Sequence, residues 1–285
     1  MNYSLLLIHS ALLRFLSPLN IFKMKWLNLI GKHSRIIMLV MFTSLITQLT
    51  AQDVTFYQYR KVDPSKIDEF IKRETTYWSK VAEKGMANGQ IQFWGLFEKV
   101  SGGNTDEPNF LFVNTFKDID EAMKGEMWDA TKIFPSVPMS KMETNSISTT
   151  TRTLLTTQRN WEQSAKLTKP DDVKFVLINY HHATNPDGFI ELEKKYWQPF
   201  IKGEMEAGRT KQLAWGNEVI LSPSAGKDGA STISIDLYPT FKDALMPNFA
   251  QDSKLPMDGL TELEKLTNAP RDIEIYRIVK IVAKN

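Results

Sequence analysis

Two glutamates occupy the same setting at two places in this sequence. Glu74 lies in the pattern Phe-Ile-x-x-Glu-x-x-Tyr-Trp, which spans residues 70–78, and Glu193 lies in the identical pattern at 189–197. On a helix, the apolar residues at this spacing form one stripe, and the glutamate falls near its centre. An ionised carboxylate facing a core loses hydration, which costs several kcal/mol or raises its pKa. Each glutamate therefore needs a basic or hydrogen-bonding partner, or it lines a wet cleft.

Two interpretations of these glutamates stay open. In the functional one, Glu74 and Glu193 are catalytic groups or polar anchors in ligand pockets. The walls of those pockets would be the following aromatic residues, namely Tyr77, Trp78, Tyr196 and Trp197. In the structural one, each glutamate belongs to a buried pair that fixes a helix against a sheet, and gene duplication kept it twice.

The only histidines outside the first 51 residues are the neighbours His181 and His182. Neighbouring strand residues point to opposite faces, so at most one of them enters a given cleft. His181 shares the register of Asn179 and could shuttle protons with Glu193 or serve as an axial haem ligand. The alternative is a surface or hydrogen-bonded histidine at a strand end. Two histidines on opposite faces make a poor metal site, and we expect no metal.

Two tryptophans, Trp94 and Trp215, are each followed by glycine. They could stack on a flat ligand, whereas the alternative places them in the core, as for most large aromatic residues. Arg60 has no basic counterpart in the second pattern, where Asn179 stands. We therefore expect at most one cleft to keep any given function.

A tandem repeat must position these residues. The two glutamate patterns are 119 residues apart, and this offset widens to 121 at the two Trp-Gly pairs. So many matches in one order predict a duplication. We expect a first repeat at 52–160, a linker at 161–172 and a second repeat at 173–285.

Each repeat is predicted to contain strand, long helix, strand, strand, helix and strand. Asp63-Pro64 and Asn185-Pro186 are typical helix starts, and Gly89 and Gly208 are typical helix ends. The predicted strands of the first repeat are 56–60, 90–100, 110–116 and 147–155. Those of the second are 175–180, 210–221, 232–238 and 273–282.

This α+β order, βαββαβ, is the ferredoxin-like motif. Two tandem units, each with a long first helix before a Trp-Gly strand, resemble the dimeric α/β-barrel superfamily, which includes small monooxygenases, EthD-like and NIPSNAP-like proteins and some haem-binding enzymes. The resemblance covers both repeats and implies an intramolecular barrel with helices outside and one ligand-sized cleft per repeat. It further implies cofactor-free oxygenation or isomerisation by proton transfer, with Glu193 as base and His181 as partner.

The first 51 residues predict export. An apolar run at 36–46 follows Lys32 and Arg35, and a polar stretch leads to Ala51, as in a secretory signal peptide. We expect cleavage after Ala51 and a true start at Met24. An uncleaved membrane anchor is the alternative, although the run is short for a span. The chain has no cysteine, which excludes disulfides and thiolate chemistry and favours a bacterial periplasmic or secreted location.

Charge and motifs exclude several functions. Five of the 35 basic residues lie in the first 51, which hold no acidic residue, so the remainder is slightly acidic and unsuited to nucleic acid. The sequence lacks a dinucleotide fingerprint, a phosphate-binding loop, His-Glu-x-x-His and a Gly-x-Ser-x-Gly elbow.

The sequence thus predicts an exported protein that binds a small apolar or aromatic molecule beside the first helix of a repeat. Whether it is an enzyme stays open. We expect no cofactor, with haem as a minor alternative, and no stable membrane span after processing. A non-catalytic envelope protein is the competing hypothesis, and the sequence leaves the oligomeric state open.

Overall fold

The computed structural model describes residues 53–100, 107–223 and 229–283. These residues belong to one compact unit, Gln52–Asn285. The predicted signal peptide and its cleavage site lie outside the described residues. Within the described ranges, no helix combines the length and the apolar character that crossing a membrane requires.

The first repeat begins with a strand and a long helix. Strand β1 (Val54–Val62) leads into η2 (Pro64–Lys66), α4 (Ile67–Arg73), the π-helical turn η3 (Glu74–Trp78) and α5 (Ser79–Ala87), which are successive parts of that helix. The Asp63 side chain caps its start by accepting a hydrogen bond from the Ser65 amide at 2.8 Å. Gly89 has a positive φ just beyond its end, as predicted. Strands β2 (Phe93–Lys99), β3 (Phe110–Phe116) and β4 (Ser148–Gln163) complete the predicted order.

The second repeat has the same layout. Strand β5 (Phe175–His181) is followed by α8 (Pro186–Leu192), the π-helical turn η7 (Glu193–Trp197) and α9 (Gln198–Glu206). Asn185 caps this helix through the Gly188 amide, and Gly208 has a positive φ beyond its end. Strands β6 (Ala214–Ser222), β7 (Thr232–Tyr238) and β8 (Asp272–Ala283) follow. The predicted strands β3 and β7 match the observed bounds, and the other strands differ at their ends.

The prediction of a single second helix in each repeat is wrong. Short pieces replace the single second helix of the first repeat: α6 (Ile119–Met123), η4 (Glu126–Trp128), η5 (Ala130–Lys132) and α7 (Met139–Met142). In the second repeat, α10 (Phe241–Leu245) and α11 (Met257–Lys265) stand in its place. A positive φ at Gly125 and the prolines at 135, 138, 247 and 256 interrupt helical hydrogen bonding. The predicted linker 161–172 begins inside β4 and ends with η6 (Pro170–Asp172).

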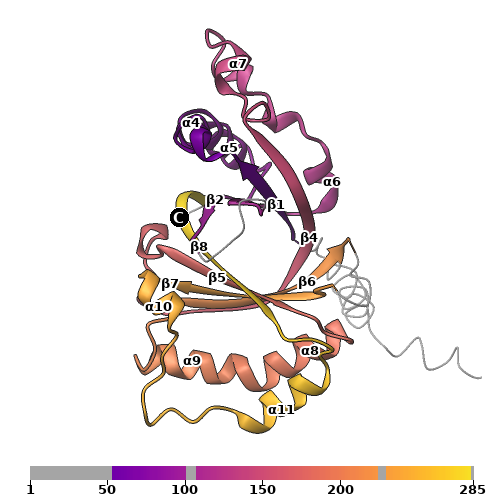
Figure 1. Cartoon of the computed structure of the whole chain (residues 1–285), viewed down its shortest axis with the longest axis vertical. Helices are drawn as coiled ribbons and strands as arrows, with labels where there is room; N and C mark the ends of the chain where they lie inside the picture. Colours follow the sequence, from indigo (N-terminus) through magenta and orange to yellow (C-terminus); the bar gives the residue numbers. More distant parts are fainter. Residues whose placement is uncertain (1–52, 101–106, 224–228, 284–285) are drawn as a thin grey trace, which may run out of the picture. The chain divides into compact units, whose positions relative to one another are not determined.

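The eight strands close one antiparallel barrel, in the order β1-β3-β2-β8-β5-β7-β6-β4. Strand β4 joins the two repeats at one seam, because its first part pairs with β1 and its later part with β6. Strand β8 does the same at the other seam, between β5 and β2. Figure 1 shows α4 and α5 outside the sheet of the first repeat, and α8 and α9 outside that of the second. The predicted intramolecular barrel with outer helices is confirmed.

Side chains of both repeats fill the barrel. Its interior cluster includes Tyr57, Leu111 and Leu154 from the first repeat and Ile178 and Ile233 from the second. Successive residues of a strand face opposite sides, so the alternate residues of these strands face the outer helices. A packed interior leaves the space between each sheet and its first helix as the place for a ligand.

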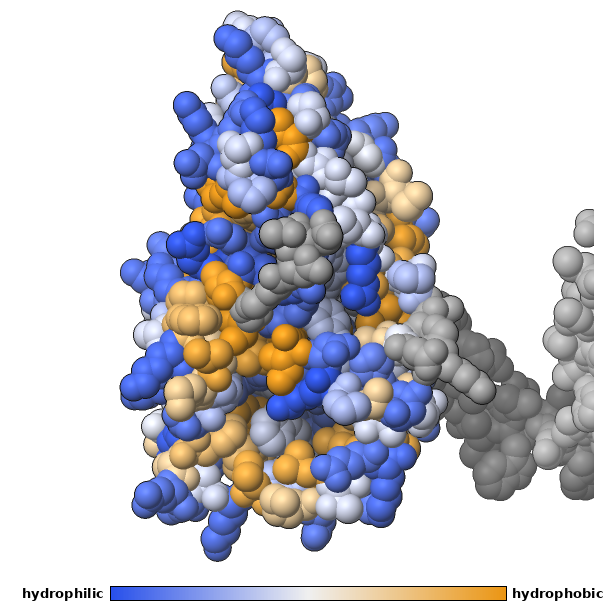
Figure 2. All heavy atoms as spheres, viewed as in Figure 1, coloured by the Kyte–Doolittle hydropathy of each residue, from blue (hydrophilic) through white to orange (hydrophobic). Residues whose placement is uncertain are grey.

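Polar and apolar side chains are mixed on the surface (Figure 2). Apolar residues gather over the region of α10, where Phe241, Leu245 and Met246 are exposed.

Candidate functional site

A cleft lies between the first helix and the outer sheet face in each repeat. Cleft 1, in the first repeat, has a volume of about 350 Å³, and its lining includes Glu74 and Trp78 from the helix. Cleft 2, in the second repeat, has about the same volume, and its lining includes Glu193 and Trp197. Both volumes fall within the range of small-molecule pockets. The two predicted glutamates therefore each reach a cleft.

Each glutamate is the first residue of a π-helical turn. These turns, Glu74–Trp78 and Glu193–Trp197, interrupt the long helix at the same place in both repeats. A π turn carries an extra residue, and such turns are frequent at functional sites. The wider turn keeps the tryptophan four residues after each glutamate on the cleft side.

The two tyrosines predicted as cleft walls do not line the clefts. Tyr77 packs edge-on against Phe134 at a ring-centroid distance of 5.2 Å. Tyr196 packs against α11 at Gly259, and the Lys195 ammonium lies 4.6 Å from its ring centroid. Each tyrosine is three residues after its glutamate, and the π turn rotates that position away from the sheet. That part of the prediction is wrong.

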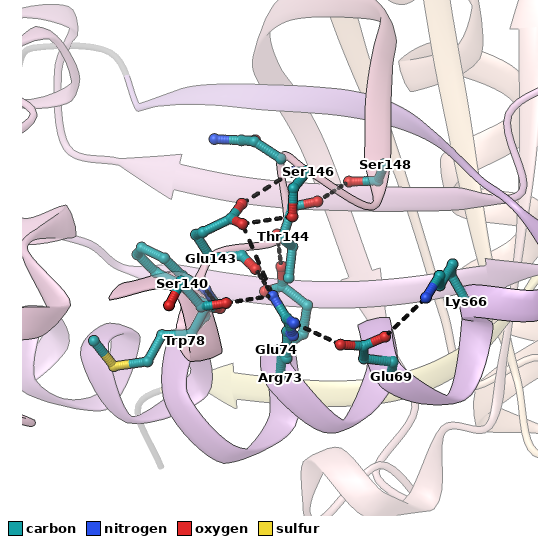
Figure 3. A network of polar contacts seen from close by, with 12 residues as sticks. Lys66, Glu69, Arg73, Glu74, Trp78, Ser140, Glu143, Thr144, Ser146 and Ser148 are labelled. Carbon is teal, nitrogen blue, oxygen red and sulfur yellow. Dashed lines mark hydrogen bonds and ion pairs between the residues drawn. The ribbon is translucent and has the colours of Figure 1, made fainter. Parts of the chain in front are cut away.

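Glu74 lies buried in cleft 1 with 4% of its surface exposed. Its Oε1 accepts a hydrogen bond from the Thr144 hydroxyl at 2.6 Å. Burial raises the pKa of Glu74 to about 7, against the opposing effects of Thr144 and the Arg60 charge. Figure 3 shows how the segment before β4, which carries Thr144, lies against the helix at Glu74 and Trp78. The Trp78 indole donates to the Met142 carbonyl at 2.9 Å and fixes the same segment.

Arg60 supplies a buried guanidinium to cleft 1 and is 6% exposed. Its Nη1 donates to Gln58 at 3.3 Å, and its Nη2 donates to Asn145 at 2.9 Å and to Ser148. Its Nε has no hydrogen-bond partner among the described residues. Burial lowers the pKa of Arg60, and the Glu74 charge opposes this effect. All the recorded hydrogen-bond acceptors of Arg60 are neutral groups.

Glu193 is held at the corresponding place in cleft 2 and is 5% exposed. Its Oε2 accepts a hydrogen bond from the Asn217 amide and its Oε1 from the Ser234 hydroxyl, both at 2.8 Å. Burial raises the pKa of Glu193 to about 7; these two hydrogen bonds and the Arg271 charge oppose the shift, and the nearby Asp236 charge adds to it. This carboxyl therefore changes protonation near neutral pH.

His181 joins the same hydrogen-bonded chain. Its Nε2 lies 2.9 Å from the Ser234 oxygen, and its ring packs on Phe189 at a centroid distance of 4.8 Å. The single Ser234 proton goes to Glu193, so His181 must donate from Nε2, which fixes its tautomer. Burial lowers the pKa of His181 to about 3, so the ring is neutral at physiological pH. The predicted neighbourhood of His181 and Glu193 is observed, with Ser234 between them.

His182 faces a different partner. Its Nε2 lies 3.0 Å from a carboxylate oxygen of Asp272, and its buried Nδ1 has no hydrogen-bond partner among the described residues. It also lies on the lining of cleft 2. His182 is therefore placed at the cleft, outside the Glu193 chain of hydrogen bonds.

A second carboxyl, Asp236, completes cleft 2. It accepts hydrogen bonds from Asn179 at 2.9 Å and from Gln212 at 2.6 Å. Burial raises its pKa to about 6. Arg271, from the segment just before β8, also lines the cleft and is exposed to solvent. Cleft 2 thus holds two buried carboxyls below an exposed guanidinium.

Both predicted tryptophans of the Trp-Gly strands line a cleft and are also core residues. Trp94 is 2% exposed and Trp215 is 1% exposed. Trp94 packs with Phe112 at a centroid distance of 6.1 Å, and Trp215 belongs to the cluster of Ile201 and Met205. Each therefore forms a cleft floor and has little free surface for stacking.

Sequence reasoning predicted His181 but missed Ser234 and Asp236, which the sheet also contributes to cleft 2. Ser234 and Asp236 alternate on β7, and Asn179 and His181 alternate on β5. Polar residues at every second position of a predicted strand share one face of the sheet, and this pattern could have indicated that they line the cleft. Thr144 and Arg271 stand before β4 and β8, where no periodic pattern could indicate them.

The ring nitrogens of the two histidines determine which of them could hold haem or a metal, and the buried Nδ1 of His182 has no hydrogen-bond partner among the described residues. The Nε2 atoms of His181 and His182 already have Ser234 and Asp272 as partners, so neither ring presents a free Nε2 as an axial ligand. No cluster of three or more metal-binding side chains occurs in residues 53–100, 107–223 and 229–283.

Comparisons with known proteins support the fold. No protein-family model matches the sequence, and no curated protein gives a significant sequence match. A candidate monooxygenase from Lactobacillus acidophilus superposes with a TM-score of 0.54 at 11% identity, over 81% of this chain and 96% of its own. Another from Fusobacterium nucleatum subsp. nucleatum gives 0.54 at 13% identity, over 84% and 97%. A haem-binding protein from Thermus thermophilus gives 0.41 at 7% identity, over 80% and 91%, too distant to transfer a cofactor.

These likenesses extend over nearly the whole length of the two candidate monooxygenases. The chain therefore has the dimeric α/β-barrel fold, and the resemblance predicted from the repeats is confirmed at that level. At such identities the likeness shows fold alone, and function has to be argued from the clefts.

Proposed function

We propose that this protein binds a small molecule in cleft 2 and moves a proton on it, with Glu193 as the base. One observation carries the proposal: Glu193 is buried on the cleft lining, its two oxygens have only neutral hydrogen-bond donors, and its pKa is about 7. A general base works best when its pKa lies near the operating pH. Removal of a proton is also the step that cofactor-free oxygenation and isomerisation share.

The neighbours of Glu193 suit this role. Ser234 holds Oε1, and Asn217 holds Oε2, so the carboxylate has a fixed orientation while each oxygen keeps a free lone pair. His181 acts through Ser234 and never contacts the ligand in this scheme; it is a positioning residue. When Glu193 takes up a proton, the Ser234 hydroxyl can turn toward His181 if that ring shifts its proton to Nδ1. The hydrogen bonds from Glu193 through Ser234 to His181 can therefore form whether Glu193 is ionised or protonated.

The competing hypothesis is a purely structural role for Glu193. A structural carboxyl with an ion-pair partner stabilises the fold, as Glu204 does with Arg209 at 2.6 Å. No ion pair of Glu193 is recorded among the described residues. The contrast favours a role for Glu193 other than stability.

A neutral carbon acid tests the proposal without knowledge of the natural ligand. The probe is 5-nitrobenzisoxazole, which ring-opens after loss of one proton and gives a coloured phenolate. We expect turnover that rises with an apparent pKa near 7, and a loss of about 10²-fold in Glu193→Gln. Glu191→Gln is the matched control, because Glu191 is exposed on the same helix two residues away. A rate unchanged by Glu193→Gln would refute the proposal.

We also propose that the protein is exported and begins at Gln52 after cleavage. The support is the signal-peptide pattern in residues 1–51. The test is intact mass measurement of the protein recovered from a bacterial periplasm. A chain that keeps residues 24–51 would contradict cleavage.

A further inference from the structure

Cleft 1 and cleft 2 differ in electrostatic character although they occupy equivalent places, because the guanidinium of cleft 1 is buried, whereas cleft 2 has two buried carboxyls and an exposed guanidinium, Arg271. Cleft 1 presents the buried Arg60 where cleft 2 has Asn179, and it presents Asn114 where cleft 2 has Asp236. A ligand that suits one cleft is therefore disfavoured in the other. The two clefts require separate ligand assignments.

The Arg60 guanidinium lacks an anionic partner within ion-pair distance among the described residues. Its three recorded hydrogen bonds go to Gln58, Asn145 and Ser148, which are all neutral. A guanidinium has five N–H donors, so two remain, and one of these is the buried Nε–H. A buried charge without a counter-ion is costly. The only carboxyl recorded as influencing Arg60 is Glu74, whose own burial favours its neutral form.

A second buried polar atom on the lining of cleft 1 also lacks a hydrogen-bond partner among the described residues. It is Oδ1 of Asn114 on β3. Buried polar atoms in native structures are nearly always hydrogen-bonded, and those left over call for a water or ligand. The two unsatisfied atoms belong to residues of the same cleft, from neighbouring strands β1 and β3.

The remaining walls of cleft 1 are mostly aromatic. They are formed by Phe56, Trp78, Phe112, Phe116 and Trp128, and Trp94 lies on the floor. At the position equivalent to Phe112, cleft 2 has Ser234. Flat apolar walls around one guanidinium suit a planar ring that carries a single negative group.

From this arrangement we propose that cleft 1 is a binding site for a small aromatic carboxylate, whose carboxylate pairs with Arg60 and whose ring lies between the aromatic walls. A guanidinium matches a carboxylate in shape as well as charge, through parallel N–H donors. Cleft 2 is a poorer competitor for this ligand because it holds the buried carboxyls of Glu193 and Asp236, and its guanidinium, Arg271, is exposed to solvent. The proposal goes beyond proton transfer in cleft 2 and shares no residue with it.

Isothermal titration calorimetry of the purified chain with two probes tests this site. Indole-3-carboxylate carries the charge, and indole-3-carboxamide has nearly the same shape without it. We expect the carboxylate to bind at least tenfold more tightly than the carboxamide. Equal affinity, or no binding of the carboxylate, would overturn the proposal without the need for any variant.

Variants then locate the binding. Arg60→Gln should weaken carboxylate binding at least tenfold and remove the preference for it, and Arg60→Lys should keep part of that preference because it retains the charge. Lys72→Gln is the matched control, since it removes an exposed positive charge from the outer side of the same repeat. Melting temperatures establish that each variant is folded. Undiminished carboxylate binding in a folded Arg60→Gln protein would also overturn the proposal. None of these results bears on the rate measured for Glu193.

Discussion

Replacing Glu193 by glutamine removes one ionisable group and keeps the shape of the side chain. The glutamine oxygen can accept from Asn217, and its NH2 group can donate to Ser234, whose hydroxyl then donates to His181 Nε2 once that ring carries its proton on Nδ1. Protonated Glu193 and glutamine are therefore nearly equivalent in this site. The two proteins differ mainly when the pH is high enough to ionise Glu193.

The size of that difference follows from the pKa of Glu193. Burial raises it from 4.5 to about 7, and each unit corresponds to about 1.36 kcal/mol. The folded state binds the proton more tightly than the unfolded chain, so ionisation destabilises the fold. The loss of folding free energy caused by ionised Glu193 is absent below pH 4.5, grows between pH 4.5 and 7, and is complete above pH 7. Wild type should therefore lose about 3 kcal/mol relative to Glu193→Gln between pH 4 and pH 9.

Urea unfolding of both proteins at pH 4, 5.5, 7 and 9 measures this difference directly. Glu204→Gln is a control of opposite sign, because the Arg209 hydrogen bonds lower the pKa of Glu204 and make its ionised form stabilising. Wild type should gain stability over Glu204→Gln as the pH rises. A free-energy difference between wild type and Glu193→Gln that does not change with pH would refute the claim that this carboxyl is desolvated and forms no ion pair.

Four further predictions concern packing and protonation. Gly259→Ala should lower the free energy of unfolding by about 1–3 kcal/mol, because its Cβ would lie 2.4 Å from Tyr196; Gly203→Ala, with open space around it, should stabilise by about 0.5–1 kcal/mol. The His181 ring should stay uncharged between pH 5 and 9, since burial lowers its pKa to about 3, so its 15N NMR shifts should show no imidazolium form in this range. Tyr59→Phe should cost about 1 kcal/mol in urea unfolding, because Tyr180 loses a hydrogen bond of 2.6 Å inside the barrel.

The repeat and its strand order were predictable because they depend on local, periodic signals. The caps at Asp63 and Asn185 and the positive-φ glycines at 89 and 208 each act within a few residues. Burial of Glu74 and Glu193 followed from the apolar stripe around them. A barrel closed by strands β4 and β8 was expected only from the resemblance, since pairing across repeats leaves no short-range pattern.

The cleft chemistry was less predictable, because it depends on which strand faces meet the helix. Ser234 and Asn217 come within 2.8 Å of Glu193 from strands far along the chain. Thr144 reaches Glu74 from an irregular segment. The π turns were also invisible in the sequence, and they reversed the prediction for Tyr77 and Tyr196. A regular helix would have brought those tyrosines closer to the clefts.

Comparison of Glu74 with Glu193 helps to decide whether these glutamates have a structural or a functional role. Each is buried against neutral hydrogen-bond donors, and each has a pKa near 7, so each destabilises the fold above neutral pH. A residue retained only for packing would be replaced by glutamine or leucine with a gain in stability. The residues around the two glutamates differ. Glu74 shares cleft 1 with Arg60 and aromatic walls, whereas Glu193 shares cleft 2 with Asp236 and His181. A shared carboxyl that lowers stability, with different surroundings in each repeat, fits the proposal that the two clefts bind separate ligands.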